Sequence, residues 1–187
     1  MGESKTAGTR GRRIAFGTLG CKLNQFETDA LATQFRTNGY EIVPYESAAD
    51  AYVINSCTVT NKSDRKSRNV INRVARPRDG AARGIPSLEG ATAENAPTGG
   101  PVAGEKPIIV VTGCFVESHR SYLDARDDIT YVVDNRRKSR IFDIVDAHFR
   151  GEIMSTESLD RLQGSPFAYS LADRRFHTRS MVKIQDG

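Results

Sequence analysis

Three cysteines are the residues of this sequence whose chemistry and spacing stand out. Cys21, Cys57 and Cys114 each follow an apolar run typical of a buried strand, and those runs span residues 14–16, 52–54 and 109–111. The carboxyl ends of parallel strands meet at one edge of a sheet, so we expect the three thiols to converge there. An odd number of cysteines without a C-x-x-C pair argues against a disulfide framework, a zinc ribbon and a thioredoxin motif.

The sequence around the cysteines favours thiolates. Helical sequence follows each one, and a helix N-terminus lowers the pKa of a thiol. Gly20 and Gly113 directly precede Cys21 and Cys114, which permits tight turns and the close approach of a bulky ligand. Three thiolates suit a soft metal, and a four-iron cluster held by three protein ligands would keep one iron open.

Two other interpretations of the cysteines stay open. A zinc ion is the first, with His119 from the following helix as the fourth ligand, although a histidine at this spacing is more typical of a helix surface. In the second, the cysteines are three unrelated small residues of the core. Position alone favours the metal site.

The elements that must position the cysteines alternate between strand and helix. Apolar periodicity predicts helices over residues 24–38, 63–76, 117–127 and 137–150, and strands over 14–16, 40–44, 51–54, 108–111 and 131–133. The strand at 40–44 ends in Pro44, which is typical of an edge strand. We therefore predict an α/β fold, doubly wound around a mostly parallel sheet with helices on both faces, of the Rossmann or flavodoxin-like kind.

Four segments are expected to lie outside this core. Residues 1–12 predict a disordered basic tail, and residues 79–106 predict a disordered insertion because their 6 Gly, 6 Ala and 3 Pro bury too little apolar area. Polar sequence predicts a linker over 152–175, most clearly at 155–165. Residues 176–187 resemble the first strand of a further barrel domain, so we expect the sequence to be a fragment.

Composition limits the function classes. Apolar residues make up 38% and charged residues 27% of the 187, which supports one modest core. No window approaches the ~18 apolar residues of a membrane span, and the N-terminus lacks the apolar region of a signal peptide. We expect a cytoplasmic protein, without a membrane partner and monomeric.

A basic segment follows Cys57. The net charge of +4 permits an RNA partner without requiring one. The positive residues nearest the expected site could bind phosphates, while a solvated helix face is an equally good interpretation of them; they are Lys62, Arg65, Lys66 and Arg68. No aromatic residue is interleaved with them, so we expect no base stacking from this segment.

The cysteine motifs resemble those of the radical S-adenosylmethionine methylthiotransferases. The likeness spans residues 13–151 and 176–187, and its motifs are 17–27 (GTLGCKLNQFE), 55–60 (NSCTVT), 66–68 (KSR), 111–114 (VTGC) and 183–187 (KIQDG). Within the family, Gly-Cys-Lys-Leu-Asn-Gln followed by Cys-Thr-Val-Thr is most similar to the branch that acts on threonylcarbamoyladenosine in tRNA. The isopentenyladenosine and ribosomal-protein branches usually carry other residues after the first cysteine.

The resemblance implies an auxiliary 4Fe-4S cluster on Cys21, Cys57 and Cys114. That cluster would hold or supply the sulfur that is methylated on carbon 2 of the adenine beside the anticodon, with tRNA and a sulfur donor as partners. A second 4Fe-4S cluster would cleave S-adenosylmethionine, but its C-x-x-x-C-x-x-C motif is not in this sequence. We expect the domain to be inactive by itself, with no catalytic residue of its own.

A non-catalytic module on a flavodoxin-like sheet is the competing function, binding either a metal or a nucleotide. The sequence carries neither G-x-G-x-x-G nor a P-loop, so a nucleotide site has little support.

Overall fold

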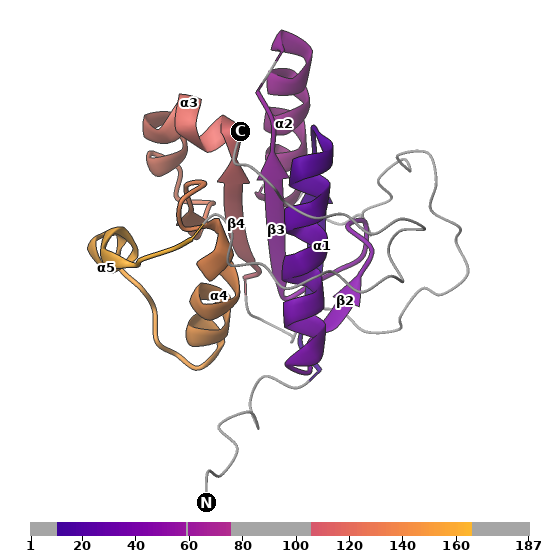
Figure 1. Ribbon diagram of the computed structural model, residues 1–187, viewed down its shortest axis with the longest axis vertical. Coiled ribbons are helices and arrows are strands. Elements are labelled where there is room, and N and C mark those ends of the chain that lie inside the picture. Colours follow the sequence, from indigo (N-terminus) through magenta and orange to yellow (C-terminus); the bar gives the residue numbers. More distant parts are fainter. Residues whose placement is uncertain (1–10, 59, 76–105, 166–187) are drawn as a thin grey trace, which may run out of the picture.

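One parallel sheet organises the protein (Figure 1). The computed structural model describes residues 11–58, 60–75 and 106–165. Its five strands lie in the order β2-β1-β3-β4-β5, and all four neighbouring pairs are parallel. The strands are β1 (Arg13–Thr18), β2 (Glu41–Val43), β3 (Ala51–Ser56), β4 (Ile108–Gly113) and β5 (Tyr131–Val132). The predicted α/β fold is confirmed, with a described sheet that is parallel throughout.

Helices cover both faces of the sheet. Side chains of α1 and α4 pack on one face, where Figure 1 shows α1 in front of the strands, and those of α2 and α3 pack on the other. The helices are α1 (Lys22–Thr37), α2 (Asn61–Ala75), α3 (Cys114–Asp124), the 3-10 turn η1 (Lys138–Arg140), α4 (Ile141–Phe149) and α5 (Thr156–Arg161). This is the doubly wound arrangement that the sequence predicted.

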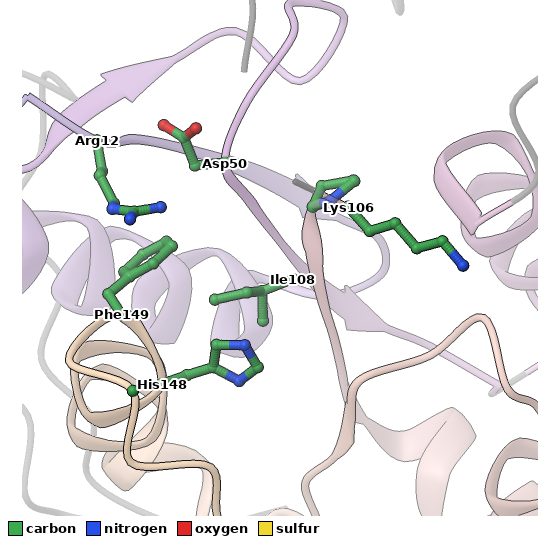
Figure 2. Close-up of a pocket in the computed structure, with 8 residues that line it drawn as sticks. Arg12, Asp50, Lys106, Ile108, His148 and Phe149 are labelled. Atoms are coloured by element: carbon green, nitrogen blue, oxygen red, sulfur yellow. The ribbon is translucent and has the colours of Figure 1, made fainter. Parts of the chain in front are cut away.

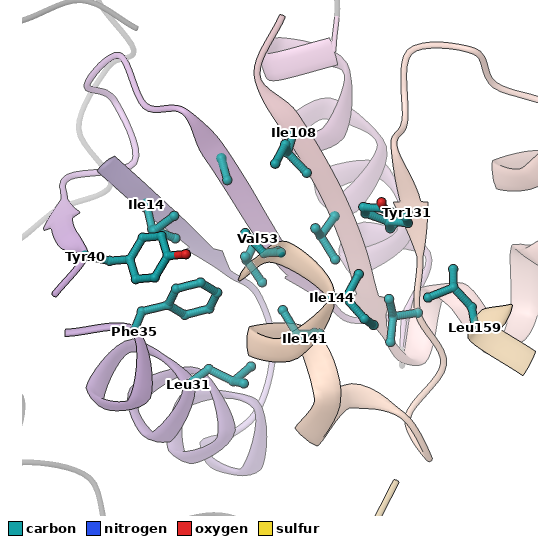
Figure 3. Packing of buried hydrophobic residues seen from close by; sticks show 14 residues of the cluster. Ile14, Leu31, Phe35, Tyr40, Val53, Ile108, Tyr131, Ile141, Ile144 and Leu159 are labelled. Carbon is teal, nitrogen blue, oxygen red and sulfur yellow. The ribbon is translucent and has the colours of Figure 1, made fainter. Parts of the chain in front are cut away.

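The core lies in two layers, one on each face of the sheet. Every residue of β3 and β4 is buried, as expected for central strands covered on both sides. Figure 3 shows the layer between the sheet and helices α1 and α4, which contains Phe35 and Tyr40. The Phe35 ring meets the rings of Tyr40 and Phe142 edge to face, at centroid distances of 5.2 and 5.1 Å. Burial of each such large side chain stabilises the fold by about 1.5–3 kcal/mol. The two layers hold the strands, and hence the loops at their ends, in fixed positions.

The expected linker contains a short helix within its described part, residues 152–165. The Ser155 side chain caps α5 by accepting a hydrogen bond from the Ser158 N–H, and Leu159 is buried against the α1 and α4 layer. Gly164 lies so close to the backbone of Arg136 that a Cβ there would overlap its carbonyl oxygen. One buried leucine is therefore enough to fix a stretch whose composition is otherwise polar.

The other expected segments cannot be compared with the structure. Residues 1–10 of the expected tail, residues 79–105 of the expected insertion (79–106) and residues 166–187 lie outside the described residues. None of the helices described for this chain has both the length and the apolar character needed to span a lipid bilayer.

Candidate metal centre

All three cysteines lie at the carboxyl edge of the sheet. Cys21 is the N-cap of α1, three residues after the end of β1, Cys57 follows β3, and Cys114 is the first residue of α3 after β4. The strand order reverses between β1 and β3, and ligands of doubly wound folds bind at such a switch point. Cys21 is exposed, Cys114 is half-buried and Cys57 is buried. The prediction that the fold brings the three loops to one edge is thus confirmed.

The thiols do not form a closed metal site. Among the residues described, no three His, Cys, Asp or Glu side chains are grouped closely enough to hold a metal ion. The expected convergence therefore holds for the loops and not for the sulfur atoms. The ring of His119 stacks on Phe115 at a centroid distance of 4.2 Å, and its Nε2 lies 3.4 Å from Asp64 Oδ1. Because the His119 ring contacts Phe115 on α3 and Asp64 on α2, the structure gives no support to a zinc ion with His119 as fourth ligand.

The first and second cysteine loops are packed against each other. Gly20 has a φ of +108°, and a Cβ there would lie 2.6 Å from Cys57 Cβ and 2.8 Å from its Sγ. Asn24 joins the same loops, since its Nδ2 donates to the carbonyls of Leu19 at 2.8 Å and Ser56 at 3.1 Å. Gly20 thus provides the close approach that the sequence predicted, although the group it approaches is a neighbouring cysteine.

A buried serine fixes the backbone of Cys57 from both sides. Ser67 Oγ, on α2, donates to the Cys57 carbonyl at 2.7 Å and accepts from the Cys57 N–H at 3.3 Å. Ser67 is fully buried. The helix after β3 therefore determines where Cys57 lies.

The second and third loops are joined in a similar way. Gly113 has a φ of +97°, and a Cβ there would overlap the carbonyl oxygen of Ser56. The Ser56 hydroxyl in turn donates to the carbonyl of Thr112. These contacts hold Cys57 and Cys114 on adjacent strand ends.

A layer of buried polar side chains lies beneath the cysteine loops. It consists of Asn24, Glu27, Thr28, Asn55, Ser56, Ser67, Thr112, Lys138 and Ser139, each less than 9% exposed. Burying polar groups is costly unless they are hydrogen-bonded. Within the described part of the chain, Asn55 Oδ1 and Thr112 Oγ1 are buried without a hydrogen-bond partner, and these residues pair across β3 and β4. Polarity is thus concentrated at the edge that carries the thiols.

The cysteines are within electrostatic reach of one another. Burial raises the pKa of the Cys114 thiol above its ordinary value, the charge of Lys138 lowers it, and Cys57 and Cys21 raise it further. The edge thus carries three thiols and a set of buried polar side chains.

The basic residues of α2 divide into two groups. Lys62, Arg65 and Lys66 are exposed on the turns that follow Cys57. Arg68 pairs instead with Asp64 at 3.2 Å and lies 4.7 Å from the ring centroid of Tyr122. This aromatic neighbour could not be predicted from the basic segment, because it comes from α3.

A pocket among the described residues lies away from the cysteines. Figure 2 shows this cavity of about 320 Å³, in which Arg12, Asp50, Lys106, Ile108, His148 and Phe149 are labelled. These residues come from the amino-terminal ends of β1, β3 and β4 and from the end of α4, on the edge of the sheet opposite the cysteines. Sequence reasoning predicted neither this cavity nor the roles of Asn24, Ser67 and Lys138. The long-range hydrogen bonds that reveal those roles have no local pattern.

The fold and the cysteine-bearing edge define an α/β domain with a candidate thiolate site at its topological switch point. A model of the family described as "Uncharacterized protein family UPF0004" matches residues 13–134, and the chain belongs to this family.

Named relatives of this chain are methylthiotransferases. The chain is 35% identical to "Threonylcarbamoyladenosine tRNA methylthiotransferase MtaB" of Aquifex aeolicus over 136 residues, which is 73% of this chain and 27% of the relative. It is 32% identical to the protein of the same name from Bacillus subtilis, over 93% of this chain and 33% of that protein. "Ribosomal protein uS12 methylthiotransferase RimO" of Vibrio cholerae is 33% identical over 37% of this chain and 15% of its own length.

The resemblance to the N-terminal domain of methylthiotransferases is confirmed by these matches. The chain spans about a third or less of the length of these relatives.

Proposed function

We propose that this chain is the auxiliary-cluster domain of a tRNA methylthiotransferase, and that Cys21, Cys57 and Cys114 hold its 4Fe-4S cluster. The observation that carries the proposal is the location of the three cysteines, each at the carboxyl end of a different parallel strand. In a cluster each thiolate binds a different iron, so the sulfurs need not meet at one ion. The donor set and the close-packed glycine turns fit such a group.

Each part of this edge has a distinct task in that proposal. The cluster would supply the sulfur chemistry, with one iron free of protein ligands. The cysteine loops orient it through fixed backbone positions, notably the Ser67 clamp on Cys57. Gly20 and Gly113 bring the loops together. The buried polar layer forms the floor.

The substrate is proposed to be N6-threonylcarbamoyladenosine beside the anticodon, methylthiolated at carbon 2. Relatives that match most of this chain carry that substrate in their names, whereas the ribosomal-protein enzyme matches a shorter part. S-adenosylmethionine, the second cluster and a sulfur donor belong to the complete enzyme in this proposal.

Anaerobic reconstitution with iron and sulfide tests the cluster. We expect about four irons per chain and a visible charge-transfer absorption. Each of C21S, C57S and C114S should lose most of this iron, because two thiolates rarely retain such a cluster. Full iron in one variant would remove that cysteine from the ligand set. A single bound zinc, or no metal in the unaltered chain, would overturn the proposal.

Lys62, Arg65 and Lys66 are proposed to bind tRNA phosphates beside the site. Removing any one of these cations should reduce the slope of log affinity against log salt by roughly 0.7–0.9. Filter binding of tRNA to K62A, R65A and K66A measures this slope. The matched control is R36A, because Arg36 lies in the last turn of α1, at the other edge of the sheet. Equal slopes in all four variants would contradict the assignment.

A further inference from the structure

A tyrosine ring lies between two arginines on the surface formed by α2 and α3. The Cζ atoms of Arg68 and Arg126 lie 4.7 and 5.8 Å from the ring centroid of Tyr122. Tyr122 is 39% exposed, whereas the next residue, Leu123, is fully buried in the core. Cations are attracted to the face of an aromatic ring, and this ring still remains open to solvent. The packing of α3 therefore depends on Leu123, and the Tyr122 ring is available to a ligand.

Hydrogen bonds from α2 and from the loop after α3 hold this cluster in place. Arg126 Nε and Nη2 donate to the Asp128 carboxylate at 2.7 and 2.8 Å. Arg126 Nη1 donates to Asn72 Oδ1 at 2.7 Å and to the Tyr122 hydroxyl at 3.3 Å. Side chains that are already ordered lose little conformational entropy on binding. A ligand thus meets a preformed surface.

Cations outnumber carboxylates on the α2 side of the ring. Helix α2 carries five cations and a single carboxylate, Asp64. Its exposed cations are Lys62, Arg65, Lys66 and Arg73. On the side of α3, two carboxylates pair with cations: Asp124 with Arg120 at 2.9 Å and Asp128 with Arg126 at 2.7 Å. The charge of α2 favours an anionic polymer as the ligand.

The ring also lies close to the cysteine edge. Helix α2 begins four residues after Cys57, and α3 begins at Cys114. Tyr122 comes eight residues after Cys114 in a helix kinked at His119, which at 1.5 Å per residue is at most about 12 Å along α3. Stacked nucleotides, spaced about 3.4 Å along a strand, cover that length in three or four steps. A strand that follows α2 can thus reach both the ring and the cysteine loops.

We propose that Tyr122 and the guanidinium of Arg68 form a stacking platform for an unpaired base of an RNA strand, whose phosphates lie along the exposed cations of α2. This inference deepens the proposed function and rests on it for the identity of that strand as tRNA. Bases stack on aromatic rings and on arginine planes. The basic segment by itself predicted no stacking, and the ring comes from the other helix. An acidic protein would be attracted by the cations but would not require an exposed ring between them.

Two RNAs of equal charge separate stacking from charge. One is a short oligoadenylate that carries 2-aminopurine, and the other is its abasic analogue with the same sugars and phosphates. The unaltered chain should bind the first RNA roughly five- to 150-fold more tightly, the range of one base–aromatic stack, and should quench its fluorescence. In Y122L we expect this preference to fall by at least about fivefold, with loss of quenching, and Y122F should retain both.

Matched variants separate the ring from the charges around it. K62A should weaken the binding of both RNAs equally and keep the quenching at saturation, because it removes charge and no ring. The control is I153A, which removes the other large apolar side chain that is exposed among the described residues, at 73%. It should bind both RNAs as the unaltered chain does.

Several results would overturn the inference. They are equal affinity of the unaltered chain for the two RNAs, a base preference that Y122L retains, and failure of the unaltered chain to bind RNA. Polyglutamate binding that Y122L weakens as much as RNA binding would assign the surface to an acidic protein instead. If Y122L does not fold, cross-linking of a 5-iodouracil RNA to the unaltered chain decides, and a link away from Tyr122 is the contrary result. Iron analysis of the same sample tests the proposed function separately, since a chain without iron can still show the base preference.

Discussion

Cys57 occupies the space that a side chain at residue 20 would need. A Cβ on Gly20 would lie 2.6 Å from Cys57 Cβ, and the backbone there has a φ of +108°. We expect G20A to lose about 1–2 kcal/mol of unfolding free energy from backbone strain alone, and more because Cys57 must move. Reconstituted iron should fall with it. Urea unfolding and iron analysis measure the two effects.

The variant G151A serves as the control, because it introduces backbone strain without displacing a neighbouring side chain. Gly151 also has a positive φ, of +83°, but nothing lies within 4 Å of its added Cβ. We expect G151A to lose stability through strain and to keep its iron. If G20A bound as much iron as G151A, the close approach of the two loops would have no bearing on the site.

Ser67 offers a second way to loosen Cys57. S67A leaves the buried N–H and carbonyl of Cys57 without their partner, and each such loss costs about 1–3 kcal/mol. We expect a lower unfolding free energy and faster alkylation of the Cys57 thiol, read by mass spectrometry. S63A on the same helix removes a solvent-side hydroxyl and should stay within about 0.5 kcal/mol of the unaltered chain. Equal alkylation rates in both variants would exclude the clamp.

The burial of Tyr45 leads us to expect a fall in the free energy of unfolding at alkaline pH. Its ring lies over Gly17 and its hydroxyl donates to the Val70 carbonyl at 3.1 Å, and burial raises its pKa well above the ordinary 10.0. The unfolded chain releases this proton near pH 10 while the folded chain keeps it. Its contribution is therefore complete below pH 10 and falls above it, by up to about 1.4 kcal/mol per pH unit.

Y45F should reduce the dependence of stability on pH above pH 10, and the raised pKa of Tyr131, which is also buried, should leave part of it in place. Urea unfolding of Y45F and of Y122F, at a series of pH values from neutral to alkaline, makes the comparison, since Tyr122 is 39% exposed. We expect the slope above pH 10 to shrink in Y45F and to persist in Y122F. The same slope in Y45F and the unaltered chain would assign the alkaline loss to another group.

The insertion between α2 and β4 can be tested by deletion. Residues 79–105 carry little that could form a core, and loop-closure free energy changes slowly with length. We expect a short Gly/Ser replacement that retains Lys106 to shift the thermal midpoint by only a few degrees. Thermal unfolding monitored by circular dichroism measures this midpoint. A large fall would show that the segment contributes to folding.

Strand positions could be predicted because burial on both faces leaves a local trace. Ile108 to Val111 are consecutive apolar residues, and they form the fully buried β4. The edge location of β2 followed from Pro44. The start of α3 could not be predicted. The helix begins at Cys114, three residues before the predicted start, and Gly113 gives a turn there but no capping side chain.

The site was predictable only as far as topology determines it. Cys21, Cys57 and Cys114 could be assigned to one edge because each follows a parallel strand. Lys138 and Glu27 are 111 residues apart, and the hydrogen bond between them is visible only in three dimensions. A lysine in a polar stretch gives no sign that it is buried.

The anchoring of residues 164 and 165 has a consequence for whatever is joined beyond them. Ser165 N–H donates to Ser139 Oγ at 3.3 Å, and Ser139 lies in η1, the 3-10 turn after β5. The tether to any following domain thus begins at the edge that carries the thiols, rather than at Gly151 on the far side of the sheet. A short tether from that point raises the effective concentration of an attached partner at the cysteines. The short tether would then favour reaction between the cysteine site and a domain of the same molecule over reaction between two separate molecules.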